Sequence, residues 1–199
     1  MRPRLRLTLA ALLLLLTALT LGVTIQVPAV QALDTAVSHW ARDNAAQHAL
    51  PVWIALTQLG YRVPDLLWLA FLSLLFWQRY RHLVWQLWCA TLSSALLIEG
   101  LKRLFARPRP DGMLFDASGF SYPSGHAAVA IALYAFSGWL LWRVHKHLVA
   151  VMLGVLALLI IASRVILNVH YPSDVIGGAL IGLAAIACAR ALISEPRLP

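Results

Sequence analysis

A histidine and an aspartate stand four residues apart in the last third of the chain. They are His170 and Asp174, with Pro172 and Ser173 between them. A short turn at this spacing would let the carboxylate accept a hydrogen bond from one imidazole nitrogen, which leaves the other nitrogen as a free base. A neutral imidazole oriented by a carboxylate is the arrangement of a nucleophilic histidine. The same pair can equally be a structural hydrogen bond, so the pair alone leaves both interpretations open.

A second histidine, His126, follows Pro123, Ser124 and Gly125 and precedes an apolar stretch. Ser124 suits the N-cap of a helix, whose exposed backbone N–H groups can face an anion. Gly125 would let a phosphate approach the backbone closely. An ordinary capped helix start would use the same residues. His126 in the first turn favours the anion, because a helix N-terminus disfavours an imidazolium unless an anion is bound nearby.

Three basic residues would supply charge-assisted donors to such an anion: Lys102, Arg109 and Arg164. Arginine can engage phosphate oxygens in bidentate fashion, and the negative charge that develops on a transferring phosphoryl group needs such donors. We interpret Arg103 and Arg107 mainly as outer-loop charges that contact lipid headgroups. Glu99 lies one helical turn from Lys102 or Arg103 and is the expected internal partner of one of them.

The composition places these residues in a membrane protein. Hydrophobic residues make up 61% and charged residues 12% of the 199 positions, and the mean hydropathy is +0.77. Apolar runs recur along the chain, and most approach the roughly 20 residues that a membrane-spanning helix needs. We therefore expect a single all-α integral membrane domain over residues 1–199 rather than a soluble fold.

Six apolar runs are predicted to cross the membrane. They cover approximately residues 7–27, 64–78, 83–104, 126–142, 148–167 and 175–192. The second run is short for a bilayer, and the sixth contains Gly177, Gly178 and Gly182, which suit close helix packing. Residues 33–60 mix polar and apolar side chains at roughly helical spacing, which predicts an interfacial helical segment on the outer side.

The charges predict the topology. The first run follows Arg2, Arg4 and Arg6 and is interpreted as a retained span, with a signal peptide cleaved near Ala32 as the alternative. In either case residues 33–60 lie outside. Basic loops at residues 79–82 and 143–147 then lie inside with both termini, as does Glu195, while the other seven acidic residues lie at or near the outer side. The ends of spans three to six, which carry the candidate residues, therefore converge on one outer face.

The remaining sequence features do not indicate another class of protein. The net charge of +8 does not indicate nucleic-acid binding, because the basic residues form short clusters and no basic face. Cys89 and Cys188 each lie inside an apolar run, where a thiol behaves as a small hydrophobe, so neither a disulfide nor a metal site is predicted. The eight tryptophans are interpreted as an interfacial belt and packing residues.

Three stretches carry a resemblance to a known family. In the first, Lys102 is followed after six intervening residues by Arg109 and Pro110. The second is a Pro-Ser-Gly-His sequence that ends at His126. In the third, five residues separate Ser163-Arg164 from His170, and three more separate His170 from Asp174. In this order they match the three signatures of the type 2 phosphatidic acid phosphatase superfamily, whose soluble relatives include vanadium haloperoxidases and bacterial acid phosphatases. The chain resembles the bacterial membrane branch, with its undecaprenyl-diphosphatases and phosphatidylglycerophosphatases B.

The resemblance implies a role for each matched residue. His170 would attack phosphorus to form a phosphohistidine, Asp174 would orient it, and His126 would protonate the leaving oxygen and then help to activate water. The phosphoryl oxygens would be bound by Lys102, Arg109, Ser124, Gly125 and Arg164. No metal and no other cofactor is implied.

The expected function is hydrolysis of a lipid phosphomonoester or diphosphate at the outer face of a bacterial plasma (inner) membrane. Undecaprenyl diphosphate, phosphatidylglycerophosphate and phosphatidic acid all fit, because the signatures recognise phosphate and not the tail; we rank the isoprenoid diphosphate first. The alternative enzyme is a phosphotransferase that passes the phosphoryl group to a lipid acceptor. A small anion transporter lacks an evident path through the spans, and the spans also disfavour a haloperoxidase. The sequence leaves the substrate and the oligomeric state open.

Overall fold

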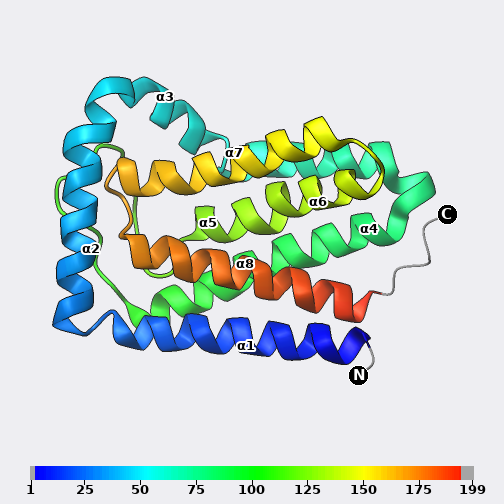
Figure 1. Cartoon of the computed structure of the whole chain (residues 1–199), viewed down its shortest axis with the longest axis horizontal. Coiled ribbons are helices and arrows are strands. Elements are labelled where there is room, and N and C mark those ends of the chain that lie inside the picture. Colours follow the sequence, from blue (N-terminus) through cyan, green and yellow to red (C-terminus); the bar gives the residue numbers. More distant parts are fainter. Residues whose placement is uncertain (1–2, 194–199) are drawn as a thin grey trace.

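The apolar runs fold as helices that lie side by side in a bundle (Figure 1). The computed structural model describes residues 3–193, so Arg2 and Glu195 lie outside the described residues. The elements, in chain order, are α1 (Pro3–Thr24), α2 (Pro28–Trp40), the π-helical segment η1 (Ala41–Ala46), α3 (Gln47–Gln58), α4 (Arg62–Phe105), α5 (Gly125–Val129), the π-helical segment η2 (Ala130–Ala135), α6 (Phe136–Arg143), α7 (His147–Ile166) and α8 (Pro172–Leu192).

Five helices in the described part of the chain are long and apolar enough to cross a membrane. They are α1, α4, the continuous helix Gly125–Arg143 made of α5, η2 and α6, and then α7 and α8. Each predicted apolar run falls almost entirely within one of these helices. The expectation of an all-α integral membrane fold is thus confirmed.

Helix α4 contains two of the predicted runs. Its 44 residues would extend about 66 Å if straight, about twice the roughly 30 Å thickness of a bilayer core. Instead the backbone leaves helical geometry at Tyr80, where φ is −132° and ψ is 34°, and the two limbs run in opposite directions (Figure 1). The indole nitrogen of Trp88 donates to Ser73 Oγ at 2.9 Å and joins the limbs. The predicted basic loop at residues 79–82 is therefore absent, because the chain reverses at a sharp kink at Tyr80 with helical residues directly on either side.

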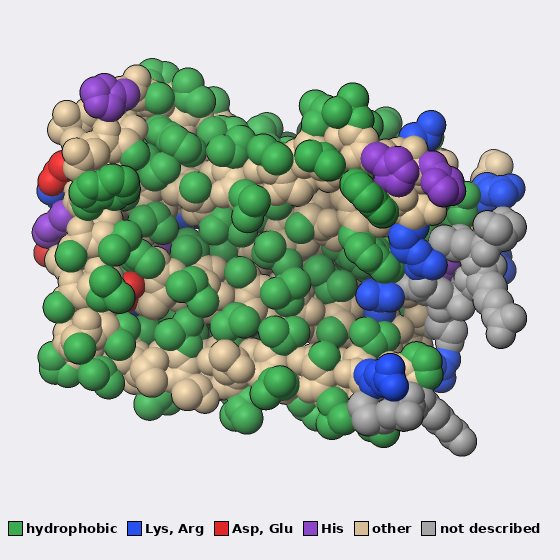
Figure 2. Space-filling view, viewed as in Figure 1, with side chains coloured by type: hydrophobic (Ala, Val, Ile, Leu, Met, Phe, Trp, Pro, Cys, Tyr) green, Lys and Arg blue, Asp and Glu red, His purple; other side chains and the backbone are tan. Residues whose placement is uncertain are grey.

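The two ends of the bundle differ in charge. On the face shown in Figure 2, most visible Lys and Arg side chains gather at the end that holds the first turn of α1 and the last turn of α8, and a broad hydrophobic surface separates them from the other end. The segment α2–η1–α3 crosses that other end (Figure 1). Residues 33–60, predicted to be an interfacial helical segment, thus form helices that lie across the bundle rather than along it.

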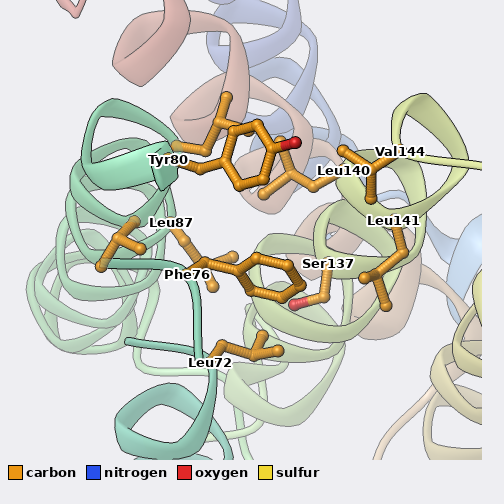
Figure 3. Close-up of a pocket in the computed structure, with 10 residues that line it drawn as sticks. Leu72, Phe76, Tyr80, Leu87, Ser137, Leu140, Leu141 and Val144 are labelled. Atoms are coloured by element: carbon orange, nitrogen blue, oxygen red, sulfur yellow. The ribbon is translucent and has the colours of Figure 1, made fainter. Parts of the chain in front are cut away.

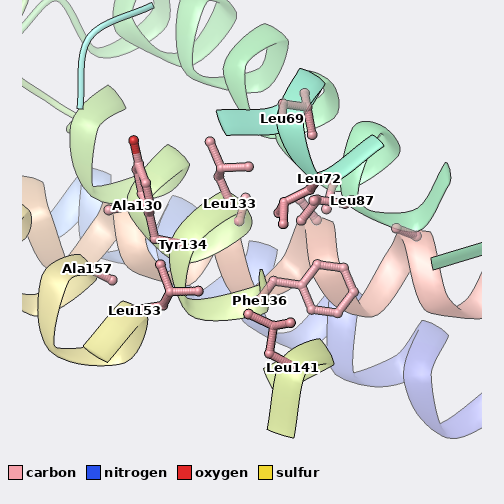
Figure 4. Packing of buried hydrophobic residues seen from close by; sticks show 14 of the residues in the cluster. Leu69, Leu72, Leu87, Ala130, Leu133, Tyr134, Phe136, Leu141, Leu153 and Ala157 are labelled. Atoms are coloured by element: carbon pink, nitrogen blue, oxygen red, sulfur yellow. The ribbon is translucent and has the colours of Figure 1, made fainter. Parts of the chain in front are cut away.

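The half of the bundle near the bend of α4 is filled by apolar side chains. Phe76 and Tyr80 from the first limb face Leu140 and Leu141 of α6 across a pocket of ≈ 30 Å³, which is too small for a lipid tail (Figure 3). The main core cluster continues from there along the centre of the bundle (Figure 4). It joins both limbs of α4 to η2, α6 and α7 through residues such as Leu69, Leu87, Leu133 and Leu153. This core fixes the helices whose other ends carry the candidate residues.

Helix α8 packs closely against its neighbours, as its small residues predict. A methyl group on Gly178 would collide with the backbone oxygen of Ser124, and one on Gly182 with the backbone oxygen of Ala128. Glycine therefore lets α8 touch the backbone of α5. On its other side α8 packs along α1, and the Ala18 carbonyl of α1 accepts a hydrogen bond of 2.5 Å from Tyr122. Helix α1 is thus packed into the bundle beside α8.

Candidate active site

Four helix ends meet at the end of the bundle that α2 crosses. They are the end of α4, the start of α5, the end of α7 and the start of α8, and a loop from residue 106 to 124 joins the first two. The loop is tied to the start of α8 by the backbone N–H of Ser124, which donates to the carbonyl of Asp174 at 2.9 Å. The predicted convergence of the three signature stretches is therefore present in the structure.

A cavity of ≈ 610 Å³ lies where these ends meet. Six of the eight candidate residues line it: Lys102, Arg109, Gly125, His126, Arg164 and His170. Ser124 and Asp174 are both fully buried beside it. The two limbs of α4 supply much of the remaining wall, with Arg62 and Asp65 on the first limb and Leu92 and Leu96 on the second. The turn before α4, the loop and α5 complete it through Gly60, Tyr61, Ala117, Ser118 and Val129.

His170 is held with one nitrogen toward carboxylate and hydroxyl oxygens. Its Nδ1 lies 3.4 Å from Asp174 Oδ2 and 3.3 Å from Ser121 Oγ, while its Nε2 lies 3.3 Å from Arg109 Nη1. Burial lowers the pKa of His170 to about 4, although Asp174 opposes the shift. The imidazole is therefore neutral at pH 7, and with Nδ1 occupied by the oxygens its Nε2 is the nitrogen available to a ligand in the cavity.

The start of α8 places Asp174 for this contact. Helix α8 begins at Pro172, earlier than the predicted Val175, because the backbone N–H of Tyr171 donates to Asp174 Oδ2 at 2.8 Å and closes the first turn. Ser121 donates to the same oxygen at 2.5 Å. The turn and the hydroxyl together fix the carboxylate that faces His170.

Arg107 occupies a position that differs from the predicted one. It is only 7% exposed, and its guanidinium pairs with Asp174 Oδ1 and with Asp34 Oδ2, both at 2.7 Å. Burial alone would lower the pKa of Arg107, but Asp174 and Asp34 outweigh it and raise the pKa. The prediction that Arg107 contacts lipid headgroups is wrong, because two buried carboxylates attract it inward. Arg103, by contrast, is exposed as predicted.

Two of the cations that line the cavity, Arg109 and Arg164, are positioned by backbone and hydroxyl groups. Arg109 donates to the carbonyl oxygens of Ser118 at 2.8 Å, Gly119 at 3.0 Å and Val169 at 2.7 Å, so its guanidinium is fixed in place. Arg164 is 2% exposed and donates from Nη1 to the hydroxyl of Thr57 in α3. Its buried Nε has no hydrogen-bond partner among the described residues. A buried guanidinium N–H without a partner is a donor that an anionic ligand can satisfy.

His126 lies in the first turn of α5, beside these cations. Ser124 is the N-cap of α5 and its hydroxyl accepts from the backbone N–H of Ala127 at 3.4 Å, which confirms the predicted capping role. The His126 ring packs edge-on against Tyr61 at 4.9 Å between centroids, and its Nε2 has no partner among the described residues. His126 and His170 therefore line the same cavity, and the Nε2 of His170 lies near Arg109 rather than near a carboxylate.

Comparison with known proteins identifies the family of this arrangement. Residues 83–196, more than half of the chain, match the family model described as the PAP2 superfamily. The chain belongs to the PAP2 superfamily.

A solved PAP2 structure resembles nearly the whole chain. The crystal structure of a transmembrane PAP2-type phosphatidylglycerolphosphate phosphatase from Bacillus subtilis superposes with a TM-score of 0.82 at 30% identity, over 92% of this chain and 94% of that one. Because it covers 92% of the chain, the likeness extends well beyond residues 83–196 that the family model matches. This PAP2 chain is accordingly a multi-pass membrane protein.

Curated PAP2 relatives match parts of the chain. Phosphatidylglycerophosphatase B of Bacillus subtilis (strain 168) is 39% identical over 98 residues, which are 46% of this chain and 48% of that protein. The putative undecaprenyl-diphosphatase YbjG of Escherichia coli (strain K12) is 34% identical over 120 residues, 57% of each. The chain thus spans about half the length of the curated relatives it matches.

Several residues around the PAP2 signatures could not be found from the sequence. Ser121 precedes the Pro-Ser-Gly-His signature, Asp34 lies in α2 and Thr57 in α3, and none of them belongs to a recognisable motif. Their contacts depend on how α2 and α3 fold over the bundle end. Arg107 lies inside the first signature, between Lys102 and Arg109, but its spacing gives no sign of burial.

Cys89 and Cys188 are free thiols, Cys89 partly buried and Cys188 exposed. Within residues 3–193, no group of three or more His, Cys, Asp or Glu side chains could hold a metal ion.

Proposed function

We propose that the protein is a lipid phosphatase of the PAP2 superfamily that cleaves a lipid phosphomonoester or diphosphate through a phosphohistidine on His170. The observation that carries the proposal is the shared cavity. An oriented, neutral imidazole opens into it together with a second histidine and three cations, Lys102, Arg109 and Arg164. Cations fixed around a neutral nucleophile suit phosphoryl transfer, where negative charge must be stabilised as the phosphorus–oxygen bond breaks.

In the first half-reaction, His170 Nε2 attacks phosphorus, and the bond from phosphorus to the lipid oxygen breaks. That oxygen takes a proton from His126 and leaves as an alcohol or as a lipid phosphate. His126 is protonated for this step because the bound phosphate offsets the surrounding cations and the helix N-terminus. Asp174 accepts the hydrogen bond from Nδ1 and stabilises the positive charge that forms on the His170 ring.

In the second half-reaction, water replaces the histidine. His126, now neutral, accepts a proton from a water molecule whose oxygen attacks phosphorus. The phosphorus–nitrogen bond breaks, inorganic phosphate leaves, and His170 returns to its neutral form. Arg109, Arg164 and Lys102 bind the phosphoryl oxygens in both steps, with the backbone at Gly125 as a further donor. Ser124 contributes through the cap that holds this backbone.

The cavity wall supports entry of the substrate from the membrane. Leu92 and Leu96 on the second limb of α4 line the cavity and are 48% and 75% exposed, and Arg62 and Asp65 line it from the first limb. The headgroup would pass between the two limbs of α4 while the tail stays in the bilayer. Because both limbs have an apolar outer surface, we take each as one membrane crossing, which gives six crossings with α1, Gly125–Arg143, α7 and α8.

The distribution of charge supports an outward-facing site. The start of α1, the bend of α4 and the turn between α6 and α7 lie at the end of the bundle away from α2 (Figure 1). These segments carry Arg4, Arg79, Arg81 and Lys146, and basic residues mark the cytoplasmic side of membrane proteins. The cavity would then face the exterior of a bacterial plasma membrane, or the periplasm, with α2–η1–α3 on the outer surface.

The substrate would be one of the lipid phosphates that the sequence predicts. The activities after which the relatives are named support phosphatidylglycerophosphate and undecaprenyl diphosphate, and phosphatidic acid presents a phosphomonoester as phosphatidylglycerophosphate does. Each offers a terminal phosphate that the three cations can bind. A phosphotransferase would use the same first half-reaction and differ only in the acceptor.

A phosphate-release assay with the purified protein tests this function. Phosphatidylglycerophosphate, undecaprenyl diphosphate and phosphatidic acid are each presented in mixed micelles, with glycerol 3-phosphate as the tail-less control and His170→Ala as the inactive control. We expect release of one inorganic phosphate per substrate consumed, at least one lipid strongly preferred to glycerol 3-phosphate, and inhibition by orthovanadate. Substrate loss without release of phosphate would support the phosphotransferase. Failure to consume any lipid phosphate would contradict both reactions.

A further inference from the structure

We propose that Asp34 of α2 and Arg107 are positioning residues for the reaction, which hold Asp174 through a buried carboxylate–guanidinium–carboxylate relay. This inference rests on the proposed function and adds to it two residues, neither of which lines the cavity. It assigns α2, a helix outside the three signatures, a part in catalysis.

The first part of the relay is the contact of Arg107 with Asp174. Arg107 Nη1 donates to Asp174 Oδ1 at 2.7 Å, while the other oxygen, Oδ2, faces His170 and accepts from Ser121. The two oxygens of one carboxylate thus have separate partners on opposite sides. Because a carboxylate held at both oxygens cannot rotate, the direction of Oδ2 toward His170 is set by the guanidinium behind it.

The second part fixes Arg107 itself. Its Nη2 donates to Asp34 Oδ2 at 2.7 Å, and its guanidinium carbon lies 4.1 Å from the centre of the Tyr171 ring. Ser173 joins both ends: its hydroxyl donates to Asp34 Oδ2 at 2.5 Å and lies 2.7 Å from Arg107 Nη1, and its backbone N–H donates to Asp34 Oδ1 at 3.0 Å. The exposed fractions of Asp34, Arg107 and Asp174 are 3%, 7% and 0%, so water screens these charges little.

The charges explain why two carboxylates are needed. An arginine paired with Asp174 alone would offset the negative charge that must stabilise the developing imidazolium of His170. Asp34 balances Arg107, so that the three groups keep a net charge of minus one beside the nucleophile. Arg107 fixes the orientation of the Asp174 carboxylate, and Asp34 compensates the positive charge of Arg107. Removal of either should therefore change the rate of the phosphoryl-transfer step rather than the binding of substrate.

The first test compares Asp34→Asn with Asp43→Asn. Both substitutions remove one carboxylate from the same outer segment, but Asp43 is exposed and pairs with its neighbour Arg42 at 2.6 Å. We expect kcat to fall about tenfold in Asp34→Asn while KM stays within about twofold, and we expect no change in Asp43→Asn. Arg107→Lys should show the same loss of kcat, because an ammonium cannot span two carboxylates; it also decides the test if Asp34→Asn does not fold.

The second test measures the titration of His170 by NMR of protein with ¹⁵N-labelled histidine, which needs no turnover. Asp34→Asn removes an anion and should lower the pKa of His170, whereas Arg107→Gln removes a cation and should raise it. The other groups that face His170, namely Asp174 on α8, Arg109 on the loop, Arg164 on α7 and His126 on α5, are the same in both variants.

Opposite shifts would distinguish the relay from a purely structural role, since unfolding alone would raise the pKa of His170 toward 6.5 in both variants. Wild-type kcat in Asp34→Asn and Arg107→Lys, or a His170 titration unchanged in both NMR variants, would overturn the inference. If the wild-type protein hydrolyses no lipid phosphate, the proposed function fails, but the titrations still decide whether Asp34 and Arg107 act on His170 through Asp174.

Discussion

At the scale of single residues, the candidate site depends on a histidine that stays neutral although it faces a carboxylate. Burial is the largest influence on His170 and lowers its pKa to about 4, and the nearby Arg164 and Arg109 act in the same direction. Asp174 opposes them but is itself paired with Arg107 and Ser121. The residue pattern alone predicts that Asp174 is the partner of His170. It does not predict the lowered pKa of His170, because the burial of the ring and the pairing of Asp174 with Arg107 follow from the fold.

The protonation of His170 can be measured directly. We expect its ¹⁵N signals to show the neutral ring from pH 8 down to near pH 5, with a midpoint at about pH 4 and His170→Asn as the assignment control. Because the folded protein binds this proton more weakly than the unfolded chain, its contribution to the free energy of unfolding is complete above pH 6.5 and is lost as the pH falls from 6.5 to about 4. A midpoint at or above 6.5 would contradict the proposed neutral nucleophile.

Ser121 gives a second prediction at this scale. Its hydroxyl donates to Asp174 Oδ2 and lies near His170 Nδ1, and a hydrogen bond to a charged group contributes about 1.5–3 kcal/mol. Ser121→Ala should therefore lower kcat by about tenfold to a hundredfold with little change in KM, measured by steady-state phosphate release. The matched control is Ser137→Ala, which removes a buried hydroxyl that bonds only within its own helix segment. Equal kcat values in the two variants would contradict a role for Ser121.

At the scale of helices, the site is held by close contact between α8 and α5. The sequence predicts close packing of the last span from Gly177, Gly178 and Gly182 but does not name its partner. In the structure a methyl group on any of the three would collide with a neighbouring residue. The sequence does not predict the reversal of α4 within a helix, since residues 79–82 contain neither glycine nor proline and their basic side chains suggest a loop. The limbs of α4 lie together because of contacts in the folded protein, which include the hydrogen bond from Trp88 to Ser73 and the shared apolar core.

A single methyl group tests the contact between α8 and α5. Gly178→Ala places a methyl group against the backbone oxygen of Ser124, so α8 must shift away from the residues that carry His126. We expect a loss of about 1–3 kcal/mol of stability, seen as a lower midpoint of thermal unfolding in detergent. Gly154→Ala in α7 is the control, because a methyl group there meets nothing within 4 Å and alanine favours a helix. A midpoint for Gly178→Ala as high as that of the control would show that the helices are not in close contact.

At the scale of the whole molecule, the sequence predicts the membrane fold and the convergence of the three signatures on one end of the bundle. It does not predict that α2 covers this end and reaches Arg107 through Asp34, because residues 33–60 have mixed polarity and no motif. The sequence places Arg107 on the outer surface for the same reason: an arginine after a span is usually solvated, and its two buried partners, Asp34 and Asp174, lie 73 and 67 residues away in the sequence.

The orientation in the membrane can be tested by cysteine labelling in intact cells, in a variant that lacks Cys89 and Cys188. Asp116, in the loop beside the cavity, and Lys146, in the turn between α6 and α7, are both exposed. We expect Asp116→Cys to react with a membrane-impermeant maleimide in intact cells, and Lys146→Cys to react only after permeabilisation. The reverse pattern would place the cavity in the cytoplasm and contradict the proposed orientation.

The central claim is the covalent intermediate on His170, and trapping it is the most direct test. The purified protein is mixed with a lipid labelled with ³²P in its terminal phosphate, quenched within one turnover, and treated with acid or alkali before electrophoresis. The account predicts label on the wild-type protein that survives alkali and is lost in acid, and none on His170→Ala. Label of the same stability on His170→Ala, or undiminished turnover by that variant, would contradict it.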